Sequence, residues 1–260
     1  MKKLFQNIVK YRRYMLYSAE ASLKADVSGS YFNWLWWVLD PFLFMMVYSF
    51  ISLIVFGKSE PHLIPFIFVG HGAWTFFSHC VTQSVKLVRG NKSILSRVYL
   101  PKYILLGSMI IENMIRYLIT VVLTVGAAII DHVQFSWYVL WFPVLFLGLI
   151  LLIFGICTIL LHIGVYMKDL NNIITVVLRL IFYLSGIFYN INKRVPKPYN
   201  KLLVYGNPIA MYMNEMRNVV LYQKAPNLKI VGLWVVISII LSVIGIRLIH
   251  KHEQTYVKAI

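Results

Sequence analysis

Residues 137–166 read WYVLWFPVLFLGLILLIFGICTILLHIGVY, a stretch that contains no Asp, Glu, Lys or Arg. A helix needs about 20 consecutive apolar residues to cross the hydrocarbon core of a bilayer. This stretch therefore predicts a transmembrane helix.

The composition of the whole chain agrees with this prediction. Of the 260 residues, 60% are hydrophobic and 13% are charged, whereas soluble domains average roughly 45–50% apolar and 25% charged residues. A soluble domain of this size would have too few polar residues to cover its surface. We therefore exclude an ordinary cytosolic enzyme and predict an all-α membrane protein with six transmembrane helices. The predicted spans are residues 34–56, 63–85, 103–130, 137–166, 173–189 and 230–249.

The first 33 residues form a predicted amphipathic segment that precedes the spans. Apolar residues recur at helical spacing over residues 3–16, and Lys3, Gln6, Lys10 and Arg13 lie on the other face. This pattern predicts a helix in the membrane interface. The segment lacks the continuous apolar core of a cleavable signal peptide, so targeting falls to the spans. We divide the chain into this segment, residues 1–33, and a six-span domain, residues 34–260.

The formal net charge of +16 comes from 25 Lys and Arg against 9 Asp and Glu. The basic residues lie between apolar runs, which favours anionic lipid headgroups over nucleic acid as their partners. With a cytoplasmic amino terminus, the inner segments carry 15 basic residues and the outer loops carry 8. Because cytoplasmic loops are enriched in Lys and Arg, we predict a multi-pass plasma membrane protein with both termini cytoplasmic.

The region of residues 190–229 does not fit this bias cleanly. It holds seven basic residues and one acidic residue, Glu215. Either the number of spans is odd and the region is cytoplasmic, or it folds back at the outer interface, where basic side chains meet phosphate headgroups. Its apolar runs are too short to span, which favours short re-entrant outer helices.

Four charged residues, Asp40, Glu112, Arg116 and Arg179, lie inside apolar runs, where charges usually face protein or water rather than lipid. Glu112 and Arg116 are four residues apart on one helix face and can neutralise each other. Arg179 has no acidic neighbour in sequence and must reach another helix, the interface or a cavity. Asp40 precedes Pro41, which predicts a break or kink in the first span.

Signatures of catalysis and metal binding are absent from the sequence. It contains no phosphate-binding G-x-x-x-x-G-K-[ST], no H-E-x-x-H and no C-x-x-C motif. His71 and His79 are eight residues apart, a spacing that favours structural histidines over a zinc pair. Cys80 and Cys157 lie inside apolar runs and are predicted to be buried thiols. We expect no catalytic residue and no metal site in this chain.

The basic loop of residues 86–102 contains a short amphipathic pattern. Ile94, Leu95, Val98 and Tyr99 fall on one helix face, while Lys92, Ser93, Ser96 and Arg97 point elsewhere. A short helix of this kind can dock into a groove of a soluble partner, or it can rest on the lipid.

Five motifs are distributed along the chain. They are Ser30-Tyr31-Phe32-Asn33-Trp34-Leu35-Trp36 with Pro41, residues 91–102, Lys168-Asp169-Leu170, residues 182–189, and Asn207-Pro208 with Glu215 and Arg217. Together they resemble motifs of permease subunits of bacterial ABC exporters for cell-surface polysaccharides, including wall teichoic acid, O-antigen and capsule. The resemblance covers nearly the whole chain, and Asn33, Phe32 and Gly186 depart from the family's usual Gly, Leu and Pro.

The resemblance implies a six-span permease that works as a homodimer beside two copies of a separate ABC ATPase subunit. The helix around Ser93–Tyr99 would then dock on the ATPase, residues 190–229 would gate the exit, and the cargo would be a glycan on a polyprenyl diphosphate lipid. The chain itself would be no enzyme and would need no cofactor, because ATP and Mg would be held by the ATPase.

Candidate site residues follow from this resemblance and from the chemistry of the cargo. Sugar rings have apolar faces and hydroxyl rims, which suits aromatic side chains, although aromatic belts that anchor helix ends are as common. The candidates for the substrate path are Tyr31, Phe32, Trp34, Trp36, Tyr183, Phe188, Tyr189 and Arg179. A diphosphate headgroup would need cations at the cytoplasmic side, for which the candidates are Lys10, Arg12, Arg13 and Lys24, unless they bind bulk anionic lipid. The candidates for ATPase coupling are Lys92, Ser93, Ile94, Leu95, Ser96, Arg97, Val98 and Tyr99.

Two rival functions remain open at this point. The first is an ABC permease for drugs or small lipids, which would respond to small amphiphiles. The second is a membrane-embedded enzyme of glycolipid assembly, which would need a polar catalytic cluster at the interface.

Overall fold

The structure is a computed structural model that describes residues 2–29, 31–55, 60–97 and 100–259. Over these residues the regular secondary structure is entirely helical, and none of them lies in a β-strand. The longer helices are α1 (Lys2–Val27), α2 (Trp36–Phe50), α3 (Leu63–Gly90), α5 (Lys102–Ile130), α6 (Phe142–Tyr166), α7 (Leu170–Leu184) and α11 (Leu228–Ala259). The shorter ones are η1 (Asn33–Leu35), η2 (Ile51–Val55), α4 (Lys92–Leu95), η3 (Trp137–Trp141), α8 (Ile191–Arg194), α9 (Tyr199–Gly206) and α10 (Pro208–Val220).

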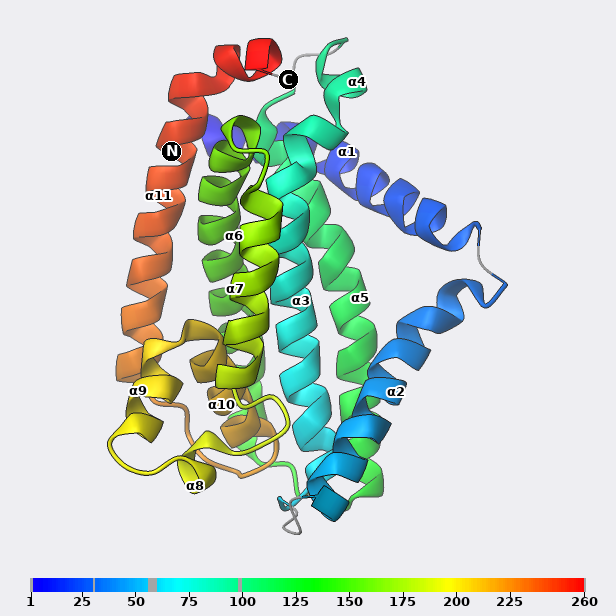
Figure 1. Cartoon of the computed structure of the whole chain (residues 1–260), viewed down its shortest axis with the longest axis vertical. Coiled ribbons are helices and arrows are strands. Elements are labelled where there is room, and N and C mark those ends of the chain that lie inside the picture. The colour runs from blue at the N-terminus through cyan, green and yellow to red at the C-terminus, as the bar shows by residue number, and fades with distance from the viewer. Residues whose placement is uncertain (1, 30, 56–59, 98–99, 260) are drawn as a thin grey trace.

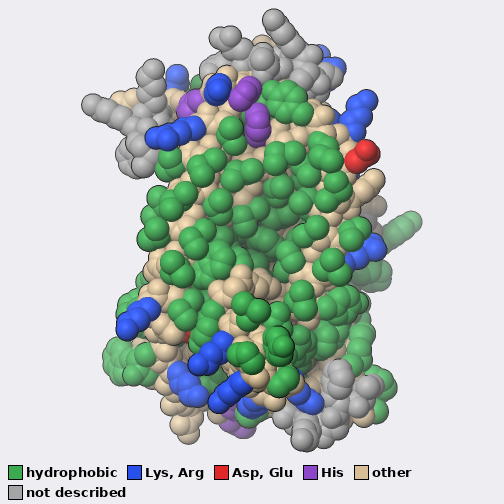
Figure 2. Space-filling view, turned by 60° about the vertical axis from the view of Figure 1, so that its left-hand side comes forward, with side chains coloured by type: hydrophobic (Ala, Val, Ile, Leu, Met, Phe, Trp, Pro, Cys, Tyr) green, Lys and Arg blue, Asp and Glu red, His purple; other side chains and the backbone are tan. Residues whose placement is uncertain are grey.

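Five helices in the described part are long and apolar enough to cross a membrane. They are Trp36–Ile54, Leu63–Gly90, Lys102–Ile130, Trp137–Tyr166 and Leu228–His252. These five match predicted spans, so the prediction of an all-helical, multi-pass membrane protein is confirmed. Figure 2 shows a broad apolar belt between two ends at which the Lys and Arg side chains gather.

The remaining predicted span, residues 173–189, forms a shorter helix than the sequence indicates. Helix α7 ends at Leu184, because the chain turns at Gly186, whose φ of +64° suits a residue without a Cβ. At about 1.5 Å per residue, its 15 residues rise only about 22 Å. By length alone, α7 is an apolar helix too short to be counted among the spans.

Helix α3 lies at the centre of the bundle and packs against α2, α5, α6, α7 and α10 (Figure 1). Helices α6 and α11 pack against each other, and small residues let their backbones approach. A Cβ on Gly155 would lie 3.0 Å from the Ser238 carbonyl oxygen, and Gly245 packs directly on Thr158. Small residues at crossings are how membrane helices gain van der Waals contact without a hydrophobic driving force.

The two ends of the bundle carry different elements. Helices α1 and α4 and the carboxyl-terminal end of α11 lie at one end, and α8, α9 and α10 lie at the other (Figure 1). Helix α10 is not a surface helix, since Ile209, Met211, Tyr212 and Met213 are almost fully buried against the bundle. Helix α10 therefore packs into the bundle, whereas the prediction that residues 190–229 form re-entrant outer helices stays a prediction.

Three local predictions need correction or extension. The amphipathic helix predicted for residues 3–16 runs on to Val27. Helix α2 continues through Pro41 without a break, whereas the predicted kink there stays a prediction. The helix predicted around Ser93–Tyr99 is one turn, Lys92–Leu95, and Val98 and Tyr99 lie outside the described residues.

Cys80 and Cys157 are buried free thiols, as predicted.

Candidate functional site

An open cavity of about 310 Å³ lies where α1, α2, α3 and α5 meet. Its walls combine aromatic rings from α2 with polar side chains from α3 and α5. Those that the argument uses are Asp26, Trp36, Trp37, Asp40, His71, Asn113 and Arg116. We call it the junction cavity, because it lies beside the turn that joins α1 to α2.

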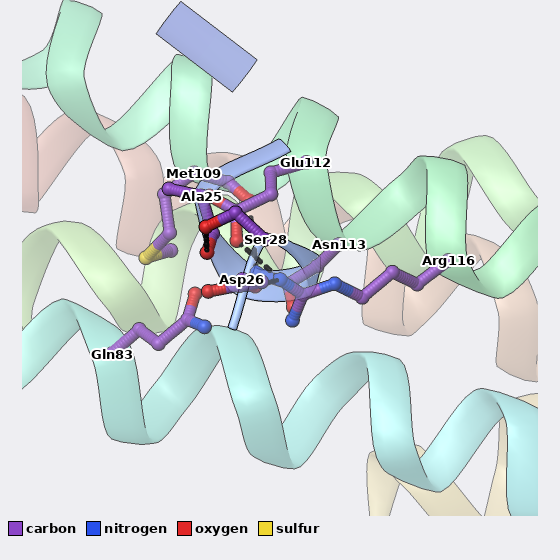
Figure 3. A network of polar contacts seen from close by, with 8 residues as sticks. All are labelled: Ala25, Asp26, Ser28, Gln83, Met109, Glu112, Asn113 and Arg116. Atoms are coloured by element: carbon purple, nitrogen blue, oxygen red, sulfur yellow. Dashed lines mark hydrogen bonds and ion pairs between the residues drawn. The ribbon is translucent and has the colours of Figure 1, made fainter. Parts of the chain in front are cut away.

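An arginine bridges two helices beside this cavity. Arg116 Nη2 lies 2.7 Å from Glu112 Oε1 on the same helix, α5, and also donates to Asp26 Oδ2 at the end of α1 (Figure 3). The pairing of Glu112 with Arg116 that the four-residue spacing predicted is confirmed. Asp26, 90 residues away in sequence, is a partner that no local pattern indicated.

Asp40 faces His71 across the cavity from α2 to α3. The two side chains approach to 3.8 Å between His71 Nε2 and Asp40 Oδ2. The His71 ring stacks on Phe44, with 3.7 Å between ring centroids. The His71 ring is therefore held by neighbours on two sides.

The candidate substrate-path residues do not form one cluster. Tyr31, Phe32 and Trp34 are exposed at the turn between α1 and α2, and Trp36 lines the junction cavity. Arg179 and Tyr183 instead line a shallow groove of about 440 Å³ between α7 and α3, opposite Trp74.

Phe188 and Tyr189 lie beyond the end of α7. Phe188 stacks on Tyr48 of α2 at 4.7 Å, and Tyr189 donates a hydrogen bond of 2.8 Å to the Tyr183 carbonyl oxygen. The structure thus divides the aromatic candidates between the α1–α2 turn and the end of α7.

The candidate headgroup ligands line up along α1. Lys10, Arg12 and Arg13 are exposed. Lys24 is also exposed and pairs with Glu20 at 2.7 Å, an interaction that raises the pKa of Lys24 and lowers the pKa of Glu20. Because both partners are solvated, this pair contributes little to stability.

The candidate coupling residues surround α4, which follows α3 after one residue. Leu95 is buried, whereas Lys92, Ser93, Ile94, Ser96 and Arg97 are exposed. Arg89 fixes the end of α3 by donating to the Val165 carbonyl oxygen of α6 at 2.9 Å. Helix α4 thus projects from a rigid base with its basic side chains outward.

A buried arginine holds the opposite end together. Arg217 of α10 donates to the carbonyl oxygens of Phe66 (3.2 Å), Gly186 (2.8 Å) and Ile187 (2.5 Å). Its guanidinium also lies 3.5 Å above the Phe66 ring. We call this group the Arg217 clamp; it joins α10 to α3 and to the turn after α7. Burial lowers the pKa of Arg217 to about 9, so it remains charged at neutral pH.

Glu215, two residues before Arg217 on α10, organises the loop that leads to α11. Its carboxylate accepts hydrogen bonds from the Asn227 amide (2.9 Å) and from the side chains of Asn214 and Asn218. The sequence singles out Glu215 and Arg217 only as parts of a motif. Their partners are mostly backbone groups, which leave no trace in the sequence.

Comparison with known proteins agrees with the class that the fold defines, a multi-pass helical membrane protein. The family model for the ABC-2 type transporter matches residues 19–221. The chain therefore belongs to the ABC-2 type transporter membrane family. It is similar over its whole length to the O-antigen export system permease protein RfbA of Myxococcus xanthus, with 23% identity and all of both chains covered. It is also 23% identical to two permeases of the same name from Klebsiella pneumoniae, over 90% of each chain.

Proposed function

We propose that this chain is the permease subunit of an ATP-driven exporter that moves a polyprenyl-diphosphate-linked cell-surface polysaccharide across the bacterial plasma membrane. The observation that carries this proposal is the similarity along the full length of the chain to permeases named for O-antigen export. The cargo would be a teichoic acid, an O-antigen or a similar glycan. ATP hydrolysis would take place on a separate ATPase subunit, which would hold ATP and Mg.

A six-span topology is part of the proposal. Helix α7 runs from the end that carries α4 to the end that carries α8 and α10, so it would supply the sixth crossing with the turn that follows it (Figure 1). The bias of basic residues then places α1, α4 and both termini in the cytoplasm. Residues 190–229 would form the outer gate, and a second copy of the chain would complete the path.

The exposed basic side chains around α4 support docking on a separate ATPase, present in two copies. Lys92 and Arg97 point away from the bundle, while the buried Leu95 anchors the turn. The groove that contains Arg179 and Tyr183 would face the path, and the cations on α1 would attract the diphosphate headgroup or the surrounding anionic lipid.

Copurification and transport test this function. The chain should bring down a nucleotide-binding ATPase when it is extracted in mild detergent. The reconstituted complex should show ATP-dependent transport of a lipid-linked glycan into vesicles. Stimulation by small amphiphiles alone would favour a drug permease, product formation without ATP would favour an assembly enzyme, and transport without any ATPase would contradict the proposal.

A further inference from the structure

Two grooves on the surface of the bundle meet on α3. The first is the groove of about 440 Å³ between α7 and α3 that contains Arg179, which we call the α7 groove. The second, of about 400 Å³, lies between α1, α3 and α5 and contains Lys86; we call it the α1 groove. Thr82 lines both of them. The two grooves therefore adjoin at one residue of α3.

A polar stripe on α3 follows these grooves. Lys86, Thr82 and Ser78 are four residues apart and so lie on one face of the helix. At 1.5 Å per residue, the stripe covers about 12 Å of α3, starting near the end of the bundle that carries α4 (Figure 1). Thr175 and Arg179, also four residues apart, line the α7 groove from the side of α7. Lys86 and Arg179 thus stand at two points of one polar route.

Arg179 is an exposed cation in the interior of an apolar helix. It lies nine residues after Leu170, about 14 Å along α7 from the end that carries α4. Side chains of a helix lean toward its amino-terminal end, so Arg179 leans away from the nearer end of α7, at Leu184. A charge at such a depth in a membrane faces a partner or water rather than lipid.

Neither cation is paired within the chain. The side chains of Lys86 and Arg179 make no ion pair or hydrogen bond in the part of the chain that the structure describes. The described spans contain two acidic residues, of which Glu112 binds Arg116 and Asp40 faces a histidine. A carboxylate of a second copy is therefore a poor partner for Arg179, and its counter-charge has to come from another molecule.

The chemistry of the stripe selects an anion. Ser78 Oγ donates to the Thr75 carbonyl oxygen (3.3 Å), and Thr82 Oγ1 donates to the Ser78 carbonyl oxygen (2.8 Å). Their hydroxyl hydrogens are used in this way, so these side chains make the stripe wettable. The donors that remain are the ammonium of Lys86 and the guanidinium of Arg179. Both groups are typical ligands of phosphate oxygens.

The acidic residue of the α1 groove is already balanced. Glu112 accepts a hydrogen bond of 2.7 Å from Arg116, and Figure 3 shows both residues beside the end of α1. Asn113, next to Glu112, donates to Gln83 of the same groove at 2.7 Å and so ties α5 to α3. Lys86 is therefore the unbalanced charge among the described residues that line this groove.

We propose that Lys86 and Arg179 bind, one after the other, the diphosphate headgroup of the lipid-linked cargo as it moves along the polar stripe. This inference rests on the proposed function and names the residues that carry the headgroup. Lys86 receives it in the α1 groove, and Arg179 holds it deeper, in the α7 groove. Because both grooves are open to the surface, the polyprenyl chain stays in the surrounding lipid.

Calorimetric titration of the full-length chain in phosphatidylcholine nanodiscs tests the two sites. The probes are citronellyl diphosphate, uncharged citronellol and inorganic pyrophosphate. The wild-type chain should bind citronellyl diphosphate about tenfold more tightly than either of the others. The double variant Lys86→Gln/Arg179→Gln should lose this difference, because a headgroup can use either site at equilibrium. Its affinity for citronellol should be unchanged.

A matched control removes the same amount of charge elsewhere. Lys229→Gln/Arg247→Gln, at exposed positions of α11 outside both grooves, should keep the tenfold difference. Arg179→Lys with Lys86 intact should keep it too, because the charge is retained. Equal affinity of the wild-type chain for citronellyl diphosphate and citronellol would overturn the proposal. A double variant that keeps the preference would overturn it as well, and equal affinity for pyrophosphate would reveal a site for free phosphate instead.

Two further measurements separate the proposal from its neighbours. The oligomeric state of the Lys86→Gln/Arg179→Gln variant should match that of the wild type, and dissociation of the variant would assign Arg179 to a carboxylate of a second copy. ATP-driven transport is measured separately with the ATPase present. Diphosphate preference without any transport would overturn the proposed function and leave the two sites standing. Transport that the double variant performs as well as the wild type would overturn the sites alone.

Discussion

Arg217 and Gly70 make contact where α10 crosses α3, and the guanidinium occupies the space that a side chain at residue 70 would fill. A Cβ on Gly70 would collide with Arg217 Nη2 and lie 2.8 Å from the Ile187 carbonyl oxygen. The Arg217 clamp, which holds α10 against the bundle, thus depends on a glycine of α3. Neither the glycine nor the arginine indicates this contact from the sequence alone.

Substitution Gly70→Ala should therefore destabilise the protein although alanine favours helices. We expect a loss of about 1–3 kcal/mol from overpacking, measured as a lower thermal midpoint in detergent. Gly232→Ala is the matched control, because no atom lies within 4 Å of a Cβ there. It should leave the midpoint unchanged or raise it, by up to about 1 kcal/mol. Equal behaviour of the two variants would contradict the close approach at Gly70.

Substitution Arg217→Lys should disrupt the clamp although the charge is kept. A lysine cannot match the planar fork that serves three carbonyl oxygens, and buried acceptors left unpaired cost about 1–3 kcal/mol each. Faster hydrogen exchange over residues 186–191 and 208–217 would reveal the loosened segment. Arg247→Lys, at an exposed position of α11, should change neither exchange nor stability.

The two carboxylates that share Arg116 should differ in importance. The side chain of Glu112 is 12% exposed and that of Asp26 is 51% exposed, so solvent screens the second pair more strongly. Glu112→Gln should lower the free energy of unfolding by about 1–3 kcal/mol. Asp26→Asn should cost less than about 1 kcal/mol, yet it should speed hydrogen exchange at the end of α1. A larger loss for Asp26→Asn than for Glu112→Gln would contradict the pairing.

If the proposed function holds, charge reversal at α4 should uncouple the permease from the proposed ATPase partner. Lys92→Glu and Arg97→Glu replace basic side chains on an exposed turn by acidic ones, which would repel a partner surface that binds the basic side chains. We therefore expect a severalfold loss of transport-coupled ATPase activity. Lys251→Glu, an exposed position in α11, is the control and should retain coupling. Unchanged coupling in both α4 variants would show that the partner docks elsewhere.

Hydropathy predicted the spans well because it depends on composition within one segment. The stretches around residues 63–85, 103–130 and 137–166 became long helices as expected. The predicted end of α7 was wrong because it depends on one positive φ angle at Gly186. The sequence predicted short apolar helices in residues 190–229, but it did not show that Met211, Tyr212 and Met213 of α10 are fully covered by neighbouring helices.

The candidate sites were predicted less completely than the fold, for a physical reason. The pair of Glu112 and Arg116 follows from spacing on one helix, so the sequence could reveal it. The contact of Arg116 with Asp26 joins residues 90 positions apart, and no local pattern indicates it. Such relationships exist only after the helices have packed.

The position of α3 has a mechanical consequence. This uninterrupted 28-residue rod, about 42 Å long at 1.5 Å per residue, begins next to Phe66 and leads through Asn91 directly into α4. The same helix therefore carries α4 at one end and, at the other, Phe66 and Gly70, which contact Arg217 of α10. A displacement of α3 along its axis would change the distances within the Arg217 clamp.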